Sequence, residues 1–416
     1  MNSLALLLIF YLFVTTTGYW LRLINLNYLK KHGTEVPAGF ENTINKDILA
    51  KTTAYTLEKS RLGLKESVIN NIIVIFFLFG GLITLYDQWI LSLSHSFIIS
   101  GMLFFIILAL VQTLIEIPFS FYDTFTIESR YGFNTTTKRL WLTDLFKSIL
   151  ISLLILSIMV SAALGLIKWS SGFWWLWLWG FFVVFSIFLM YIAPYVIEPL
   201  FFKFSPIEEK SLEDKIMEMM EKAKVKVSRV VQVDASRRSH HSNAYFSGIG
   251  RVKKIVLFDT LLKQMTQEEI IAVLAHELGH WKKGHIRKKL IMIETVSLLS
   301  FYLAYHLLAW GGLPGLLNLT QLSLPAQFVI LMFLGSLVVF PLTPLSSWLS
   351  RNHERQADQF GCELSGDPEA LASALIKLSG ENLANLHPHP FYASFYYSHP
   401  PVIERVNWLK HYEKMG

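Results

Sequence analysis

The stretch AHELGHWKKGHIRKKLIMIETVSLLSFYLAYHLLAW, residues 275–310, joins a polar, histidine-rich segment directly to a long apolar one. Its second part, 290–310, has the length of about 20 mostly apolar residues that a membrane-crossing helix requires. His276 and His280 are four residues apart, so on a helix both imidazoles lie on one face and can reach one metal ion. The stretch therefore predicts a metal-binding helix followed at once by a membrane-spanning helix.

The composition of the whole chain also indicates a membrane protein. Its 416 residues have a mean hydropathy of +0.42, and only 16% of them are charged, whereas a soluble domain carries about 25%. This deficit excludes a disordered protein, a nucleic-acid-binding tail protein and an ordinary cytosolic enzyme. The net charge of +6 fits basic loops beside an anionic leaflet, so we expect no nucleic-acid partner. The single cysteine, Cys362, cannot form an internal disulfide and is expected to be a small buried residue.

Seven stretches are apolar and long enough to span a membrane. They lie at 4–23, 68–85, 97–119, 149–167, 173–197, 290–310 and 328–348. Lys and Arg gather in the loops after the first and third stretches and are absent from the loops 86–96 and 311–327. Because basic residues stay on the cytoplasmic side, this alternation places the N-terminus outside and the polar segments in the cytoplasm. The first stretch lacks a basic flank and a clean cleavage site, so we expect a retained helix rather than a signal peptide.

The polar segment between the fifth and sixth stretches is predicted to contain helices and a small sheet. Helical periodicity with mixed charge favours a helix over 210–224, and Val and Ile favour strands over 229–234 and 251–258. A short third strand is expected at 242–247, followed by a turn at Gly248 and Gly250. Thr266 and Glu269 predict a capping box at the start of a helix over 266–283.

The predicted fold is therefore mainly α-helical, a polytopic seven-helix membrane protein with a polar domain that contains a small β-sheet. We divide the chain into five spans with their loops at 1–200, a first part of the polar domain at 201–289, two further spans at 290–348 and a second part of the polar domain at 349–416.

A catalytic metal site needs a third protein ligand and keeps one position open. His285 is a weak candidate, since five residues beyond His280 on a continuous helix its ring turns away. The segment SRNHERQADQF, residues 350–360, is a better one. Glu354 and Asp358 lie four residues apart there, so one carboxylate can bind the metal while the other holds a ligand histidine by its second nitrogen. Two spans separate this segment from the histidines, so both lie on the same side of the membrane.

Other polar residues allow more than one interpretation. Glu277 follows the first histidine, beside the open coordination position, where it can take a proton from water. His399 precedes Pro400 and Pro401 and can donate a hydrogen bond to an oxyanion, although a histidine in a loop is more often incidental. Glu116 and Glu294 lie within apolar stretches, where each either sits near an interface or faces a polar cavity or a partner. Four further histidines are expected in loops or at the surface: His240, His241, His387 and His389.

Motifs along nearly the whole chain resemble the integral-membrane zinc metallopeptidases of the CAAX prenyl protease 1 family. They are EKSRLGL (58–64), FTIESRYGFN (125–134), EPLFFKFSP (198–206), SNAYFSG (242–248), IVLFDTLL (255–262), HELGHWKKGH (276–285), SRNHERQAD (350–358) and YSHPP (397–401). The resemblance implies seven helices around a large intramembrane chamber, closed on the cytoplasmic side by a gluzincin-type metallopeptidase domain.

The resemblance also implies one Zn²⁺ per chain and a set of site residues. The implied zinc ligands are His276, His280 and Glu354, and the implied general base is Glu277. The implied supporting residues are Asp358 beside a ligand, Arg405 near the site, Asn243 and Ala244 on an edge strand that pairs with substrate backbone, and His399 at the tetrahedral intermediate.

The expected activity is hydrolysis of a peptide bond near the C-terminus of a prenylated protein or peptide, or quality control of membrane proteins in a prokaryote, by a monomer in the bilayer. The C-terminal HYEKMG has no dilysine-type signal, which favours a prokaryotic plasma membrane with the active site facing the cytoplasm; the endoplasmic reticulum is the alternative for a eukaryotic chain. A membrane chaperone with a structural zinc is the competing function. A structural site usually has four protein ligands, whereas the sequence offers three well-placed ones.

Overall fold

The computed structural model describes residues 2–247 and 253–413. The turn predicted at Gly248 and Gly250 lies outside these residues.

Within the described residues, seven helical segments are long and apolar enough to cross a membrane, which confirms the predicted number. They comprise α1 (Ser3–His32), α2 with η1 (Lys46–Val74 and Ile75–Phe79), α4 with η2 and α5 (Phe97–Tyr122, Asp123–Glu128 and Ser129–Tyr131), α6 (Lys138–Trp169), α7 with η3 and α8 (Trp174–Ile192, Ala193–Ile197 and Glu198–Phe201), α12 (His285–Trp310) and α14 (Leu324–Ser365). Between the last two lies the short helix α13 (Leu313–Leu316).

The second span ends earlier than predicted. The sequence predicts a helix over 68–85, but the helix ends at Phe79 and α3 (Leu82–Leu93) begins as a separate helix. Gly81 lies between them with φ 76°, in the left-handed region that glycine enters without steric cost. Buried Asp87 then ties α3 to the start of α14, because it accepts hydrogen bonds from the backbone N–H and the hydroxyl of Ser323.

The polar domain contains a small mixed sheet with the strand order β1–β2–β4–β3. Its strands are β1 (Phe204–Pro206), β2 (Val227–Val233), β3 (Ala244–Ser247) and β4 (Lys253–Phe258). β2 and β4 are parallel, and the other two pairs are antiparallel. The three predicted strands are present, and β1 is an additional one. β3 forms one edge of this sheet. It lies within the segment 242–247, which was predicted as a strand and contains the residues implied to pair with substrate.

Helices α9 (Lys210–Lys222) and α11 (Gln267–Lys282) pack against the sheet. Apolar residues recur along one side of α9, as in an amphipathic surface helix, and α11 buries its own apolar side in the same core. Members of this core include Leu212 and Ile216 of α9, Ile255 and Leu257 of β4, and Leu274 and Leu278 of α11. The predicted capping box is present, since Thr266 caps α11 and Glu269 bonds back to the Thr266 backbone.

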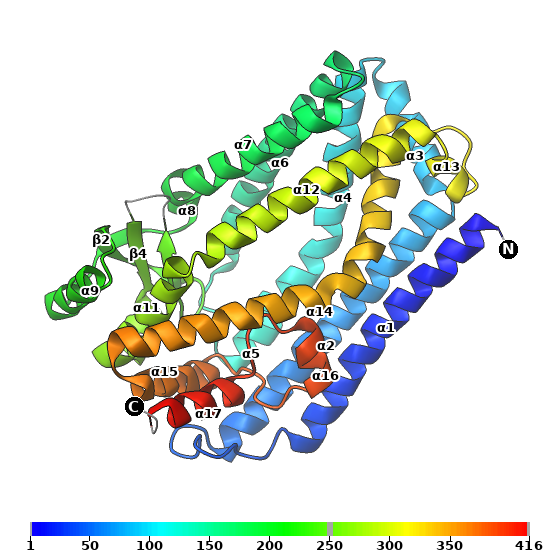
Figure 1. Ribbon diagram of the computed structural model, residues 1–416. Helices are drawn as coiled ribbons and strands as arrows, with labels where there is room; N and C mark the ends of the chain where they lie inside the picture. The colour runs from blue at the N-terminus through cyan, green and yellow to red at the C-terminus, as the bar shows by residue number, and fades with distance from the viewer. Residues whose placement is uncertain (1, 248–252, 414–416) are drawn as a thin grey trace.

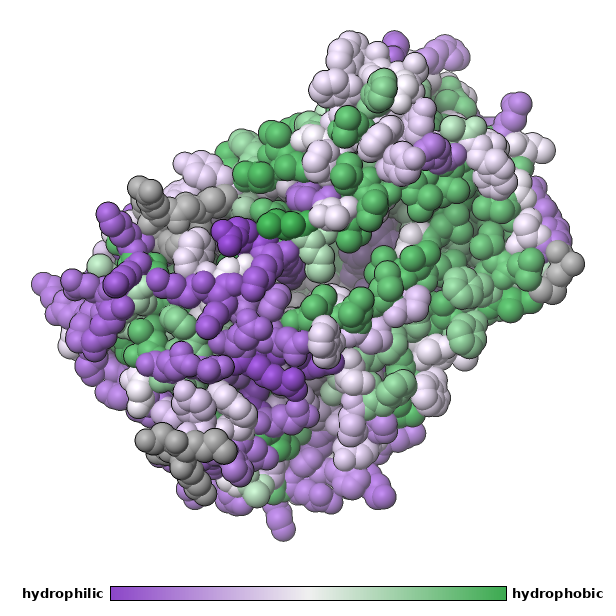
Figure 2. All heavy atoms as spheres, in the orientation of Figure 1, coloured by the Kyte–Doolittle hydropathy of each residue, from purple (hydrophilic) through white to green (hydrophobic). Residues whose placement is uncertain are grey.

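The remaining helices close the domain. They are α10 (Asp259–Gln264), α15 (Pro368–Glu381), α16 (Pro390–Tyr396) and α17 (Val402–Glu413), together with the single turn η4 (Ala235–Arg237). In Figure 1 the membrane helices run side by side away from the end of the molecule that carries the sheet, α15 and α17. Figure 2 shows hydrophilic residues over that end and apolar residues over the helices.

The membrane helices share one apolar core, in which Tyr11 of α1, Phe104 of α4 and Ile330 of α14 are buried, and they leave much of their remaining surface exposed. In α12, no residue of the most apolar 18-residue window is buried, and in α14 the buried share is 17%. Figure 2 shows this face of the molecule hollowed among the helices.

Candidate metal centre

The candidate metal centre lies where α11 crosses α14. Two glycines allow the helices to approach closely: a Cβ on Gly279 would lie 2.9 Å from backbone atoms of Ala357, and one on Gly361 would lie 3.1 Å from the backbone of His276. α14 continues without a break from the seventh span into the polar domain. The crossing therefore brings a carboxylate that follows the seventh span to the histidines that precede the sixth.

Three side chains at this crossing present metal-ligand atoms to one another. His276, His280 and Glu354 each offer one such atom, and these atoms lie within 4.8 Å of one another. The Nε2 atoms of the two histidines are 3.3 Å apart. Nε2 of His280 lies 3.2 Å from Glu354 Oε1, and Nε2 of His276 lies 3.5 Å from Glu354 Oε2. The structure thus brings together the three residues that the resemblance implies as ligands.

This arrangement fits a zinc ion. Ligand atoms at 2.0–2.1 Å in a tetrahedral site lie about 3.4 Å from one another, close to the separations seen here. Glu354 is 3% exposed, and among the described residues no donor is aligned to hydrogen-bond its Oε2, although nitrogens of His276 and His399 lie within 3.5 Å. A buried carboxylate oxygen without a hydrogen bond is costly, and a bound cation would remove that cost.

Asp358 contacts the second ring nitrogen of His276, and Arg405 in turn binds Asp358. Oδ1 of Asp358 lies 2.8 Å from Nδ1 of His276, and a carboxylate in this position leaves the lone pair of Nε2 directed at the metal. Arg405 of α17 donates to both oxygens of Asp358, at 2.6 and 2.9 Å. Arg405 also lies 3.8 Å from Glu354, so all four groups form one buried network.

Glu277 and His399 lie beside the candidate ligands and are not fully buried. Glu277 is partly exposed, and its carboxylate has no hydrogen-bond or ion-pair partner within the described parts of the chain. His399 is 63% exposed, and its Nδ1 lies 2.8 Å from Glu354 Oε2. Arg351 of α14 holds the preceding turn, since it donates to the Tyr397 carbonyl at 2.7 Å. Both side chains are therefore accessible to a bound molecule.

The electrostatics of the centre favour a cation. Burial lowers the pKa of His280, but the hydrogen bond with Glu354 and the negative charges of Glu354 and Glu277 raise this pKa above its ordinary value overall. The site therefore stabilises positive charge, as a metal centre with a carboxylate ligand must.

The expectation for His285 is wrong in one respect. We expected its ring to turn away from His280 along a continuous helix, but α11 ends at Lys282 and α12 begins at His285. Gly284 lies between them with φ 67°, and this break turns the ring back. Nδ1 of His285 lies 3.1 Å from Nδ1 of His280, and the ring stacks on His353. His285 therefore contacts the candidate ligand His280 without joining the three-residue group.

The edge strand β3 presents backbone groups to its open side. The Phe258 N–H donates to the Asn243 carbonyl at 3.0 Å, so these two residues form a hydrogen-bonded pair. Because such pairs alternate along an antiparallel ladder, the backbone groups of Ala244 and Phe246 point away from β4. The Asn243 side chain accepts from the Ala244 N–H at 2.8 Å.

Most other polar residues lie near their predicted places. Cys362 is buried and free. His387 contacts the Glu35 carbonyl, and His389 caps α16. Of the two acidic residues within spans, Glu294 faces a partner and accepts from Ser186 of α7 at 2.9 Å, whereas Glu116 is exposed and accepts from Gln112 of its own helix. His241 was expected at the surface; its side chain is 38% exposed, and it also belongs to a polar cluster between the domain and the helices.

Two family models match the chain. Residues 25–203 match the CAAX prenyl protease N-terminal region with five membrane helices, and residues 206–413 match peptidase family M48. The Arabidopsis thaliana CAAX prenyl protease 1 homolog is 32% identical over 392 residues, which are 89% of each chain. CAAX prenyl protease 1 of Saccharomyces cerevisiae is 31% identical over 92% of this chain and 90% of its own length.

The chain belongs to the CAAX prenyl protease 1 family. It is accordingly a multi-pass integral-membrane zinc metalloprotease of family M48. The fold agrees, because the crystal structure of S. mikatae Ste24p superposes with a TM-score of 0.90 at 28% identity, over 98% of this chain and 99% of that one. An uncharacterized metalloprotease of Bacillus subtilis, YhfN, is 34% identical over 75% of this chain and 72% of its own.

Proposed function

We propose that this protease binds one Zn²⁺ through His276, His280 and Glu354 and hydrolyses peptide bonds near the C-terminus of prenylated proteins or peptides. The observation that carries the proposal is the near-tetrahedral spacing of three donor atoms beside an unpaired carboxylate, Glu277. The names of the plant and yeast relatives support the substrate class. In a prokaryote, the alternative role for the same activity is quality control of membrane proteins.

The roles of the side chains follow from their positions. When bound, Zn²⁺ supplies Lewis acidity toward the scissile carbonyl and makes water more acidic. Glu277 then takes a proton from the attacking water and returns it to the leaving amine. His399, exposed at the mouth of the site, donates a hydrogen bond to the oxyanion. Asp358 keeps the Nδ1 proton of His276 in place, and Arg405 holds Asp358.

Substrate backbone is proposed to add to the open side of β3, with Asn243 and Ala244 as the first contacts. This proposal is supported by the outward backbone groups of Ala244 and Phe246, which offer the donors and acceptors that an added strand needs. The side-chain oxygen of Asn243 already accepts a hydrogen bond from the Ala244 N–H. A substrate carbonyl would replace this oxygen as the acceptor.

The competing function, a membrane chaperone with a structural zinc, is disfavoured by the ligand number. Among the described residues the metal-ligand group has three members, whereas structural zinc sites usually have four. We further propose that the protein acts as a monomer in a prokaryotic plasma membrane, with the site facing the cytoplasm; the distribution of the basic loops supports this orientation.

The test is hydrolysis of two matched peptides, one farnesylated and one unmodified, by the purified protein in detergent. We expect mass spectrometry to detect C-terminal fragments from the farnesylated peptide, 1,10-phenanthroline to abolish them, and added Zn²⁺ to restore them. Equal cleavage of both peptides would contradict the prenyl preference. No chelator-sensitive cleavage, in a preparation with one zinc per chain, would contradict the catalytic function and favour the chaperone.

A further inference from the structure

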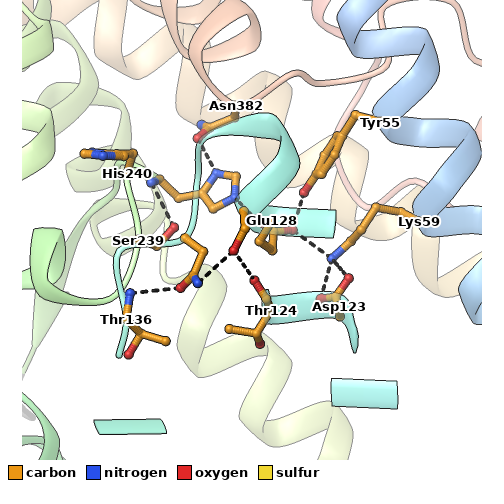
Figure 3. Close-up of polar contacts among 12 residues, drawn as sticks. Tyr55, Lys59, Asp123, Thr124, Glu128, Thr136, Ser239, His240 and Asn382 are labelled. Atoms are coloured by element: carbon orange, nitrogen blue, oxygen red, sulfur yellow. Dashed lines mark hydrogen bonds and ion pairs between the residues drawn. The ribbon is translucent and has the colours of Figure 1, made fainter. Parts of the chain in front are cut away.

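A second polar cluster lies between the end of the third span and the start of the edge strand, and none of its members belongs to the metal centre (Figure 3). Lys59 of α2 donates to both oxygens of Asp123 at 2.7 Å and to Glu128 at 3.0 Å. Tyr55 donates to the same Glu128 oxygen at 2.7 Å. The other Glu128 oxygen lies 3.3 Å from Nε2 of His241. The cluster therefore joins two membrane helices to the polar domain.

Both ring nitrogens of His241 face oxygen acceptors. Nε2 faces the Glu128 carboxylate, and Nδ1 lies 2.8 Å from the amide oxygen of Asn382, which follows α15. A protonated ring, with an N–H on each nitrogen, donates to both oxygens at once. The contact with Glu128 raises the pKa of His241 although burial opposes it. The ring also stacks on Phe133, with centroids 4.1 Å apart, so it is held on three sides.

The cluster combines two basic and two acidic side chains. Glu128 lies between Lys59 and His241, and Lys59 also pairs with Asp123. Opposite charges at these distances and partial burial favour one fixed arrangement over alternatives that leave a charge unpaired.

Backbone pairing ties the same two regions together next to His241. Asn134 forms an antiparallel bridge with Ser239, and the His240 N–H donates to the Phe133 carbonyl at 3.0 Å. The hydroxyl of Thr135 donates to the Ser236 carbonyl at 2.7 Å. The segment that leads to β3 is thus attached to the loop after the third span by main-chain and side-chain bonds together.

His241 lies in the chain just before β3, so the cluster holds the start of this strand. Asn243 and Ala244, the first proposed substrate contacts, follow His241 by two and three residues. In extended chain, three residues span about 10 Å. The His241 carbonyl accepts from Thr260 and the Asn243 carbonyl from Phe258. Displacement of His241 would therefore shift the start of β3, while the ligands on α11 and α14 would stay in place.

We propose that His241 is a positioning residue that, clamped between Glu128 and Asn382, fixes the start of edge strand β3 and so the register in which substrate backbone adds to it. This inference rests on the proposed function. It makes the end of the third span, which carries Glu128, a determinant of peptide binding and leaves the chemical step to the metal centre.

The experiment compares His241→Gln and Glu128→Gln with His240→Gln, using the farnesylated peptide. His240 is the matched control, since it is the adjacent histidine, it is exposed, and within the described residues its side chain makes no hydrogen bond. We expect the first two variants to raise KM about 10-fold with kcat within a factor of two of wild type, and the control to change neither. A fall in kcat at constant KM, or unchanged kinetics in both variants, would overturn the proposal.

The double variant Glu128→Gln/His241→Gln tests whether the two residues act as one unit. Residues that act through a single contact are not additive, so its KM should equal that of either single variant. A KM equal to the product of the two single effects would argue against the clamp. The paired amides of this variant also avoid an unpaired buried charge, which favours its folding.

Two measurements without turnover separate this inference from the proposed function. In a Glu277→Ala background, the Kd of a fluorescent farnesylated peptide should rise about 10-fold on Glu128→Gln, with zinc content unchanged. Hydrogen exchange should become faster in peptides covering 241–247 and not in those covering α11. Wild-type protein without chelator-sensitive cleavage would defeat the proposed function alone, whereas unchanged exchange at 241–247 would defeat the positioning role alone.

Discussion

Glu277 differs from the other charged residues of the metal centre because no described residue pairs with it, while the ligands and Asp358 are held in one network. A carboxylate that is free to accept and return a proton suits a general base. We predict that Glu277→Ala retains zinc, since the ligands are untouched, and lowers kcat about 10²–10⁴-fold. Metal analysis together with single-turnover cleavage checks this, and cleavage at the wild-type rate by a zinc-loaded variant would refute the role.

Asp358 acts through His276. Because it accepts from Nδ1 of His276, Asp358→Asn should weaken zinc binding about 10–100-fold, and excess Zn²⁺ should restore much of the lost activity. Competition with a zinc chelator of known affinity measures the change. The control is Asp367→Asn, a carboxylate that caps α15 away from the metal. Wild-type zinc affinity in Asp358→Asn would show that the histidine is oriented by other contacts.

At the scale of elements, α11 is anchored at the end opposite its second histidine. Glu269 bonds to the Thr266 backbone at 2.9 Å, to Ser373 at 2.6 Å and to Lys377 at 2.8 Å. The latter two lie on α15, so one buried carboxylate joins the metal-binding helix to a second helix. The capping box could be predicted from the spacing of Thr266 and Glu269, whereas the bonds to α15 could not, because they depend on how the helices pack.

This anchor predicts a pH dependence of stability. Burial raises the pKa of Glu269, but the bonds from Lys377, Ser373 and Thr266 lower it below its ordinary value overall. Folding therefore stabilises the ionised form. That contribution is fully present above the unfolded pKa of about 4.3 and is lost as the pH falls through the lower folded pKa.

We predict that Glu269→Gln lowers the free energy of unfolding at pH 7 by about 2 kcal/mol and so lowers the melting temperature. The difference in melting temperature between this variant and wild type should become smaller below about pH 4. Thermal denaturation in detergent across pH 3–7 measures both effects. Glu268→Gln is the control, since Glu268 pairs with Lys215 at the surface, where ion pairs contribute little. A difference that stays constant over this pH range would contradict the assignment.

At the scale of the whole molecule, the basic loops predict the orientation in the membrane. His95 lies at the end of the helices with few basic residues, and Lys222 lies on the polar domain; both are exposed. In a Cys362→Ala background, we predict that a membrane-impermeant maleimide labels His95→Cys in intact bacteria and labels Lys222→Cys only after permeabilisation. The reverse pattern would place the active site outside.

Much of the architecture could be predicted because it depends on patterns local in the chain. A run of apolar residues predicts a span wherever it occurs, and seven runs predicted seven spans. The break at Gly81 was missed because the apolar run continues through it. The strand β1 was missed because three residues ending in Pro206 carry little β signal.

The histidine pair and its adjacent glutamate could be identified from the sequence because a helix places residues four apart on one face. The third ligand could be proposed from its own helical spacing and from the even number of spans between the two segments. The spacing of Glu354 and Asp358 also predicted a carboxylate beside a ligand histidine, whereas Arg405 came from the family resemblance alone; the structure brings Asp358 and Arg405 into contact with the centre.

The contacts of His241 and His285 had no signal in the sequence. Their neighbours, Glu128, Asn382 and His353, come from other parts of the chain, and nothing in the local pattern distinguishes a clamped histidine from a solvated one. Helix periods, span lengths and donor chemistry are properties of neighbouring residues, so the amino-acid order was sufficient to predict them. Which surfaces meet depends on packing between distant segments, such as the approach of α11 to α14 at Gly279 and Gly361, and this only the folded chain reveals.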